Sequence, residues 1–390
     1  MAQASTLFTS WAALPSWRSG SFAWKPHLQP EANRLRQDLD AVGADAFEAA
    51  LAVESRRRID DFLAGIEAYR RHPYQRRLPE VPVLWQDGTT RLLDYRSPGA
   101  AGPPVLVVPS LINRSYILDL TPRRSLMRNL AARGLRPFLV DWGAPGAGER
   151  GFGLDDYVAG RLSAILDVVL AAAGPPAVVG YCMGGLLALG LGVLRQEAVR
   201  GLGLLATPWD FHQPNSDQMR MVAAMRPAIE ATLDGFGELP LDILQAMFAT
   251  VDAGSIERKF RAFSHLPKAG AKARAFVAME DWLNDGVPLT AAVARQTLFG
   301  WYVDNLPAKG DWRLAGRRIA AGDFTRPALA LVPSKDRIVP PASAVALAEG
   351  LPACRLRMVD SGHIGMVTGA RAGTEVYAVL ARWLHRLAVA

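Results

Sequence analysis

The sequence predicts an α/β protein with a mainly parallel sheet and helices on both of its faces. Short apolar runs recur along the chain, and segments with helical periodicity lie between most of them. This alternation is typical of parallel strands joined by helical crossovers. The chain has 390 residues, of which 50% are hydrophobic, so it can bury a full core. After a hairpin in residues 81–96, around Asp87-Gly88, the runs expected to form strands are 105–109, 137–141, 177–180, 202–206, 328–332 and 355–359.

The sequence of the N-terminal part indicates an arm followed by helices. Residues 1–30 combine Ser and Pro with Trp11, Trp17 and Trp24. We expect an irregular arm that docks by these aromatic side chains, because tryptophans are unusual in a freely solvated tail. Residues 31–72 have helical periodicity. The apolar residues of this segment fall on two faces, Leu35, Leu39 and Val42 on one and Ile59, Phe62, Leu63 and Ile66 on the other.

The interval from residue 209 to residue 320 is too long for a simple crossover between two strands. We interpret it as an inserted helical cap over an apolar substrate channel, although an ordinary helical core would have the same composition. The expected organisation is an N-terminal arm with helices (1–80), a first core part (81–208), the cap (209–320) and a second core part (321–390). The cap is rich in Met and aromatic residues: Met219, Met221, Met225, Met247, Phe248, Phe260, Phe263, Trp282, Trp301 and Tyr302.

A glycine-framed turn follows the strand expected at 177–180. The run Gly180-Tyr181-Cys182-Met183-Gly184 has the spacing of the G-x-S-x-G nucleophile elbow of α/β-hydrolases, with Cys in place of Ser. Glycines at the flanking positions let strand and helix approach closely, and the N-terminus of the new helix favours a thiolate. The alternative is a buried, inert Cys in a tight turn.

An elbow cysteine needs a base, and the base needs a carboxylate that orients it. Asp336 follows one expected strand, and His363 lies in a Gly-framed loop after the next. α/β-Hydrolases carry nucleophile, acid and base in this order, and open α/β sheets place their chemistry in loops at strand ends. The sequence therefore predicts an α/β-hydrolase fold with a Cys182–His363–Asp336 triad.

An oxyanion hole would complete this site. One donor is expected to be the backbone N–H of Met183, the residue after the nucleophile. The second should come from the loop after strand 105–109, at Leu111 or Ile112. In the same loop, Asn113 and Arg114 are expected to take polar, substrate-binding roles near the mouth of the site, or simply to cap the loop.

Composition argues against several classes of function. Two cysteines form no disulfide framework, which fits a reducing cytoplasm. We find no secretory signal and no run of about 18 apolar residues that would predict a membrane span. The net charge of +7 is scattered along the chain, which disfavours a nucleic-acid partner. We expect no metal and no cofactor.

Several further stretches, taken in order with the elbow, are GIEAYRRHPYQRR, WQDGTTRLLDY, VPSLINRSYILDL, LVDWGAPG, LDDYV, GYCMGG, DWLNDGVPL, WYVDNLPAKGDW, KDRIVP and SGHIGMVTG. Together they resemble the polyhydroxyalkanoate synthases, especially the shorter class III catalytic subunits. The resemblance runs from about residue 58 to near the C-terminus, and the Cys-for-Ser elbow is itself a family trait.

The resemblance implies a cytoplasmic acyltransferase that polymerises (R)-3-hydroxyacyl-coenzyme A into a polyester and releases coenzyme A. By family motif, Cys182 carries the growing acyl chain, His363 is the base and Asp336 is the triad carboxylate. The resemblance also implies a dimer at the surface of polymer granules and, for class III enzymes, a second and unrelated subunit.

Two alternatives stay open. One is hydrolysis on the same scaffold, by an intracellular polyhydroxyalkanoate depolymerase or an acyl-CoA thioesterase. The other is a non-catalytic, granule-associated paralogue. Arg337 is a departure from the resemblance, because family members commonly carry His directly after the triad Asp. The second cysteine, Cys354, begins an expected strand, and we expect it to be buried and inert.

Overall fold

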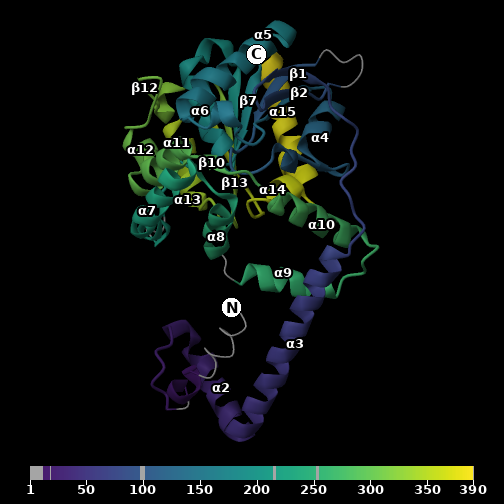
Figure 1. Ribbon diagram of the computed structural model, residues 1–390, viewed down its shortest axis with the longest axis vertical. Coiled ribbons are helices and arrows are strands. Elements are labelled where there is room, and N and C mark those ends of the chain that lie inside the picture. The colour runs from purple at the N-terminus through teal and green to yellow at the C-terminus, as the bar shows by residue number, and fades with distance from the viewer. Residues whose placement is uncertain (1–11, 18, 97–101, 214–216, 252–253, 390) are drawn as a thin grey trace. The chain divides into compact units, whose positions relative to one another are not determined.

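The computed structural model describes residues 12–17, 19–96, 102–213, 217–251 and 254–389 (Figure 1). The chain divides into two compact units. The first contains Met1–Tyr74 and Asp252–Val277, and the second contains Gln75–Val251 and Ala278–Ala390. Residues 252–277, which the sequence analysis placed in the cap, therefore group with the N-terminal helices.

The second unit contains an eight-stranded sheet in the order β1-β2-β6-β3-β7-β8-β13-β14. The β1–β2 and β2–β6 pairs are antiparallel and the other five are parallel, which confirms the predicted fold class. Each predicted strand is present, with its ends shifted by at most one residue. The strands are β1 (Val83–Asp87), β2 (Thr90–Asp94), β3 (Pro104–Val108), β6 (Arg136–Asp141), β7 (Ala177–Tyr181), β8 (Gly201–Leu205), β13 (Ala328–Pro333) and β14 (Cys354–Val359).

Helices cover both faces of this sheet. A Cβ on Gly192 would lie 3.3 Å from Leu202 of β8, whereas a Cβ on Gly203, the next strand residue, would lie 3.3 Å from Leu380. Because neighbouring strand residues point to opposite faces, the helices that carry Gly192 and Leu380 lie on opposite sides of the sheet, as Figure 1 shows. The helices around the sheet are α4 (Leu126–Ala132), α5 (Ser163–Ala173), α6 (Met183–Leu194), α13 (Pro341–Gly350), α14 (Gly365–Thr368) and α15 (Ala378–Val389).

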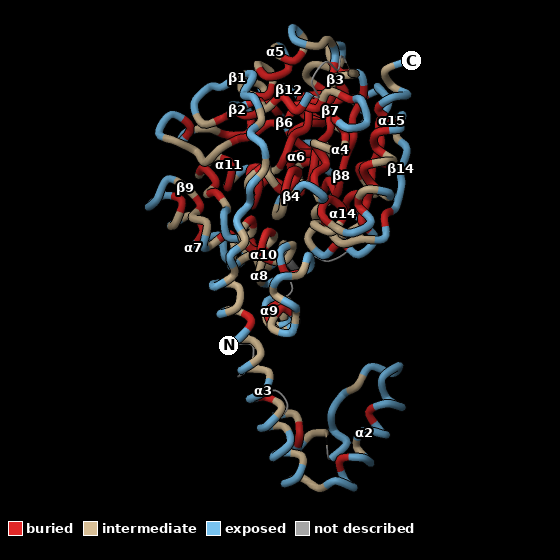
Figure 2. Tube along the Cα trace, turned by 90° about the vertical axis from the view of Figure 1, so that its right-hand side faces the viewer, coloured by how far each residue is buried: buried red, intermediate tan, exposed pale blue. Residues whose placement is uncertain are grey.

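The core of the second unit lies between the sheet and these helices. Figure 2 shows the buried residues concentrated in the central strands and in α6. All residues of β3 after Pro104, and all of β7 and β8, are buried, as are residues Met183–Val193 of α6. A parallel sheet covered on both faces needs such continuous apolar strands, because neither face meets water.

The segment between β8 and β13 is mostly helical, as the sequence predicts. Its short strands β9 (Glu238–Leu239) and β10 (Leu289–Thr290) pair antiparallel. Short pairs also join β4 (Asp119–Thr121) to β5 (Arg124–Ser125) and β11 (Arg313–Leu314) to β12 (Arg317–Arg318). The helices of the segment are α7 (Asp217–Phe236), α8 (Leu241–Val251), α9 (Ser255–Ser264), α10 (Ala271–Asn284), α11 (Ala291–Ala294), a π-helical stretch (Arg295–Val303) and α12 (Leu306–Lys309).

The first unit is built on α2 (Gln29–Val42) and the long helix α3 (Ala44–Arg70), which packs against α9. The two helices approach so closely that a Cβ on Gly65 would lie 2.0 Å from the backbone oxygen of Phe260. Phe263 of α9 is fully buried in a small core with Ala68 and Tyr69 of α3. Phe260 and Phe263, predicted as cap residues, thus belong to the packing of this unit.

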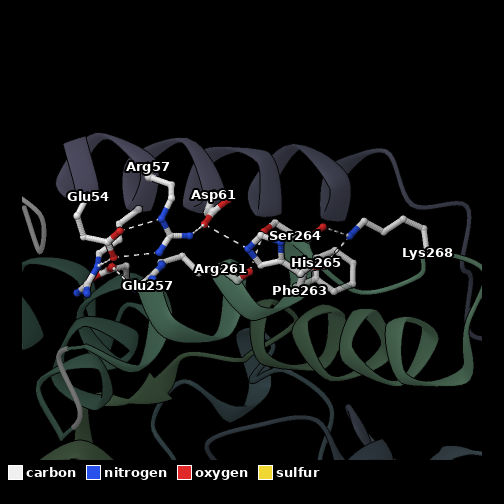
Figure 3. A network of polar contacts seen from close by, with 10 residues as sticks. Glu54, Arg57, Asp61, Glu257, Arg261, Phe263, Ser264, His265 and Lys268 are labelled. Atoms are coloured by element: carbon white, nitrogen blue, oxygen red, sulfur yellow. Dashed lines mark hydrogen bonds and ion pairs between the residues drawn. The ribbon is translucent and has the colours of Figure 1, made fainter. Parts of the chain in front are cut away.

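Polar contacts within α3, within the α9 region and between the two accompany this packing (Figure 3). Arg57 donates hydrogen bonds to Glu54 at 2.8 Å and to Asp61 at 3.0 Å. Nε2 of His265 lies 3.2 Å from a carboxylate oxygen of Asp61. Lys268 donates to carbonyl oxygens at the end of α9 and so caps that helix. Arg57 and His265 are more than half exposed, so we assign the stability of the unit mainly to its apolar contacts.

The N-terminal arm differs in part from the expectation. Residues 12–17 are helical rather than irregular. The rings of Trp17 and Trp24 do pack together, with centroids 5.9 Å apart, whereas Trp11 lies outside the described residues. Within the described part of the chain, no helix combines the length and the apolar character needed to cross a membrane.

The apolar face predicted for α2 is only partly buried. Leu39 is buried, but Leu35 and Val42 are 45% and 60% exposed. On α3, Leu63 is 55% exposed, while the other residues of its predicted face are half-buried. Periodicity therefore identified the helices correctly but overestimated how much of each apolar face is covered.

Candidate active site

Cys182 lies at a strained turn between β7 and α6. It has φ 56° and ψ −130°, a conformation that costs a non-glycine residue free energy. A Cβ on Gly180 would lie 2.3 Å from the Cα of Gly185, and one on Gly184 would lie 2.2 Å from the backbone oxygen of Val108. The glycines are thus required for the close approach of strand and helix that holds Cys182 at the end of the sheet.

His363 and Asp336 meet beside Cys182, although they come from loops after β14 and β13. Nδ1 of His363 lies 2.7 Å from Oδ2 of Asp336, and both residues are buried. The other carboxylate oxygen of Asp336 accepts hydrogen bonds from the backbone N–H groups of Ile338 and Val339, each at 2.9 Å. Asp336 is therefore fixed from both sides and in turn orients the imidazole ring.

The surroundings of His363 favour its protonated form. Burial alone would lower its pKa. The charge of Cys182 and the side-chain hydrogen bonds to Asp336 and Cys182 outweigh burial, so the pKa of His363 lies well above its ordinary value. His363 can thus accept a proton from the Cys182 thiol, and the carboxylate of Asp336 stabilises the resulting imidazolium.

Tyr181 supports His363 on another side, which the sequence analysis did not anticipate. Its hydroxyl donates to the backbone oxygen of His363 at 3.2 Å, and the two rings lie 5.3 Å apart between centroids. Burial raises the pKa of Tyr181 well above its usual range, so the hydroxyl stays a donor. The signal that could have revealed this role is the place of Tyr181 at the end of a buried strand, directly before the nucleophile.

The first predicted oxyanion donor, Met183, directly follows the elbow cysteine. Met183 is the first residue of α6, so its N–H has no partner within the helix. Among the described residues, nothing accepts a hydrogen bond from the N–H of Met183 or of Leu111. The N–H of Ile112 instead donates to Ser110 Oγ at 3.1 Å. Of the two alternatives for the second donor, Leu111 is therefore the one with a free N–H.

Asn113 and Arg114 connect their loop to residues near the end of α10. Asn113 forms an isolated β-bridge with Gly286. Nε of Arg114 lies 3.4 Å from a carboxylate oxygen of Asp285, and the carbonyl oxygen of Arg114 accepts a hydrogen bond from Trp282 Nε1 at 2.8 Å. Neither side chain lines the cavity described next, so these contacts favour a structural role in the loop.

An apolar cavity opens beside Cys182, within the second unit. The space open to the centre of a water-sized molecule is about 100 Å³. Five of the ten Met and aromatic residues predicted for the cap contribute to its wall. The lining residues are Ile112, Cys182, Met183, Pro208, Phe211, Met221, Val222, Leu244, Met247, Phe248, Thr250, Leu289, Thr297, Leu298, Trp301, Tyr302, Ile338 and Val339.

Other candidate residues lie outside this cavity wall. Arg337 is exposed, next to the buried Asp336. Cys354 is half-buried at the start of β14, and burial raises the pKa of its thiol, which keeps it protonated. In the described part of the chain, no cluster of three or more His, Cys, Asp or Glu side chains could hold a metal ion.

The chain is similar in sequence to known proteins. A family model described as alpha/beta hydrolase fold matches residues 103–370. The poly(3-hydroxyalkanoate) polymerase subunit PhaC of Haloferax mediterranei is 29% identical over 309 residues, which cover 77% of this chain and 63% of that protein. The PhaC subunit of Synechocystis is 31% identical over 72% of this chain and 77% of its own length, and that of Allochromatium vinosum is 30% identical over 79% and 88%.

The match thus spans slightly less than two thirds of the Haloferax protein but most of the other two relatives. The family model covers more than half of the chain, and it includes Cys182, Asp336 and His363. The chain therefore belongs to the α/β-hydrolase fold family and, within it, to the family of poly(3-hydroxyalkanoate) polymerase subunits PhaC.

Proposed function

We propose that this chain is a polyhydroxyalkanoate synthase, which polymerises (R)-3-hydroxyacyl-CoA into polyester and releases coenzyme A through a covalent acyl-Cys182. The observation that carries the proposal is a strained elbow cysteine, with an oriented His363–Asp336 pair, at the wall of an apolar cavity. The names of the PhaC relatives support the same activity. Coenzyme A belongs to the substrate, and the proposal requires no further cofactor.

The first half-reaction forms the acyl-enzyme. His363 accepts the proton of the Cys182 thiol, and the thiolate attacks the thioester carbonyl carbon of the substrate. The developing oxyanion lies near the backbone N–H groups of Met183 and Leu111. The carbon–sulfur bond to coenzyme A then breaks, and His363 returns the proton to the leaving thiolate, which departs as free coenzyme A.

The second half-reaction forms the ester bond of the polymer. The hydroxyl at C3 of the next monomer, or of the chain end, attacks the acyl-Cys182 carbonyl carbon while His363 accepts its proton. The bond to Sγ breaks, and Cys182 leaves with that proton restored. Hydrolysis would follow the same steps with water as the nucleophile, so the apolar wall of the cavity is what favours polymerisation.

Coenzyme A release, measured together with product analysis, tests this proposal. Wild type and Cys182→Ala are incubated with (R)-3-hydroxybutyryl-CoA, and Cys354→Ala serves as the matched cysteine control. We expect wild type and Cys354→Ala to release coenzyme A and accumulate polymer, and Cys182→Ala to do neither. Free 3-hydroxybutyrate as the only acyl product would instead identify a hydrolase, and no turnover by folded protein would favour the non-catalytic paralogue.

The assembly is also part of the proposal. The relatives are named as subunits, which supports a synthase with more than one chain. We propose a homodimer that works at the polyester granule surface in the cytoplasm, with a class III-type second subunit for full activity. The same coenzyme A assay, run with and without such a subunit and combined with light scattering, tests this part.

A further inference from the structure

Within the part of the chain that the structure describes, one hydroxyl in the wall of the Cys182 cavity has no partner. Of the lining side chains, Thr250, Thr297 and Tyr302 carry hydroxyls. Thr250 donates to the backbone oxygen of Met247 at 2.7 Å, and Thr297 to that of Val293 at 2.8 Å. Among the described residues, nothing forms a hydrogen bond with the hydroxyl of Tyr302.

An unpaired hydroxyl in apolar surroundings costs free energy unless a water or a ligand satisfies it. The one other unpaired polar atom on a lining side chain, within the described residues, is Nε1 of Trp301. That atom is sealed from solvent, and the Trp301 ring packs edge-on against Trp312 with centroids 5.5 Å apart. The hydroxyl of Tyr302 is therefore the free side-chain donor that a molecule in the cavity can reach.

The position and charge state of Tyr302 suit a donor beside the reacting group. Its ring packs against Phe211, with centroids 4.8 Å apart, which limits its motion. Burial, with the negative charges of Cys182 and Asp336, raises the pKa of Tyr302 well above its usual range, so the phenol stays protonated. The hydroxyl thus interacts electrostatically with the charge of Cys182 but forms no hydrogen bond with it.

The chemistry of the substrate suggests what this donor binds. The carbonyl oxygen of an acyl group on Cys182 already has the N–H groups of Met183 and Leu111 as expected partners. The next polar atom along a 3-hydroxyacyl chain is the oxygen on C3, and the rest of the chain matches an apolar wall. We propose that Tyr302 is a specificity-determining residue whose hydroxyl binds the 3-hydroxyl of the acyl group held at Cys182.

This inference rests on the proposed function, since it concerns the same acyl-enzyme. A site that hydrogen-bonds a substrate hydroxyl discriminates against the analogue that lacks it, because its own polar group is then left unpaired. One buried hydrogen bond contributes about 1–1.4 kcal/mol, which corresponds to a factor of roughly five to ten in rate.

The test compares two acyl donors in single-turnover acylation of Cys182, followed by the mass of the intact protein. The donors are (R)-3-hydroxybutyryl-CoA and butyryl-CoA, which differ only in the 3-hydroxyl. The variants are wild type, Tyr302→Phe and the matched control Tyr95→Phe. Tyr95 lies outside the cavity wall and donates its hydroxyl to Asp119 at 3.0 Å.

We expect Tyr302→Phe to lower the ratio of the two acylation rates by about five- to tenfold, with the butyryl rate unchanged. Tyr95→Phe should keep the wild-type ratio. An unchanged ratio in Tyr302→Phe, or an equal loss of both rates, overturns the assignment of Tyr302 and leaves the proposed function intact. Failure of wild type to form any acyl-Cys182 refutes the proposed function itself, and the inference with it.

Discussion

Replacing Asp336 by Asn tests the chemistry of the site most directly. The Asn oxygen can still accept the N–H groups of Ile338 and Val339, so the loop should keep its conformation. Its NH₂ group, however, would face the protonated Nδ1 of His363, where two donors cannot pair. The substitution therefore breaks a buried, charge-assisted hydrogen bond of 2.7 Å and leaves His363 without its counter-charge.

The expected loss of acylation rate follows from the cost of breaking this buried pair. Removing one partner of a buried ionic pair costs about 3–5 kcal/mol. If this loss falls on the transition state for acylation, the rate drops by roughly 10²–10⁴, since about 1.4 kcal/mol corresponds to a factor of ten. Loss of the carboxylate also lowers the pKa of His363, so the alkaline limit of acylation should move to lower pH.

The raised pKa of His363 also determines how the effect of Asp336→Asn on folding stability depends on pH. The pKa of His363 is raised in the folded protein, so its contribution to stability is fully present below the unfolded pKa of about 6.5 and is lost as pH rises through the folded pKa. Asp336→Asn should therefore destabilise the protein more at pH 6 than at strongly alkaline pH.

Single-turnover acylation by (R)-3-hydroxybutyryl-CoA across pH, read by intact mass, measures the effect on rate. Asp360→Asn is the matched control, because this exposed carboxylate pairs with Lys335 and Arg371 at the surface. The control should stay within about threefold of wild type. An Asp336→Asn rate within threefold of wild type, with an unmoved pH profile, would refute the role assigned to the His363–Asp336 pair.

Three further substitutions separate structural from chemical roles. Gly184→Ala should destabilise the protein by about 3 kcal/mol, because the added Cβ meets the backbone oxygen of Val108. Thermal unfolding measures this effect, and a thermal midpoint equal to that of wild type would contradict the packing argument. Cys354→Ala should leave labelling of the protein by iodoacetamide at neutral pH unchanged, because Cys182 is the expected reactive thiol. A marked loss of labelling would show that Cys354 is the reactive thiol instead. Arg337→His restores the residue common in the family. It should change the acylation rate less than threefold, because Arg337 is exposed and lies outside the cavity wall. A larger change would assign position 337 a part in proton transfer.

Local patterns were enough to predict the framework of the site. The strands were predicted to within a residue because a parallel sheet buried on both faces requires continuous apolar runs. Cys182, Asp336 and His363 could be placed together because each follows a strand of that sheet, and the ends of parallel strands meet at one edge. The order of strands along the sequence thus predicted that residues up to 181 positions apart lie close together in the fold.

Contacts that depend on a particular partner could not be predicted. Phe260 and Phe263 have helical spacing, but nothing in that spacing shows that α3 would cover them rather than the sheet unit. Likewise, periodicity placed Leu39 and Val42 on one face of α2, although only Leu39 is buried. Tyr302 was recognised only as one of ten Met and aromatic residues of the cap, because a free hydroxyl is visible only once the partners of its neighbours are known.

The cavity wall and the Tyr302 hydroxyl bear on one chemical problem. A polymerase that works through an acyl-cysteine must keep water from the thioester and still admit a hydroxyl. A lone water in this cavity would find few partners, since most of the lining side chains are apolar and the threonine hydroxyls are already bonded. A 3-hydroxyacyl chain gains both the apolar contact and the proposed bond to Tyr302. We therefore expect the same arrangement to favour ester formation over hydrolysis and 3-hydroxyacyl groups over simple acyl groups.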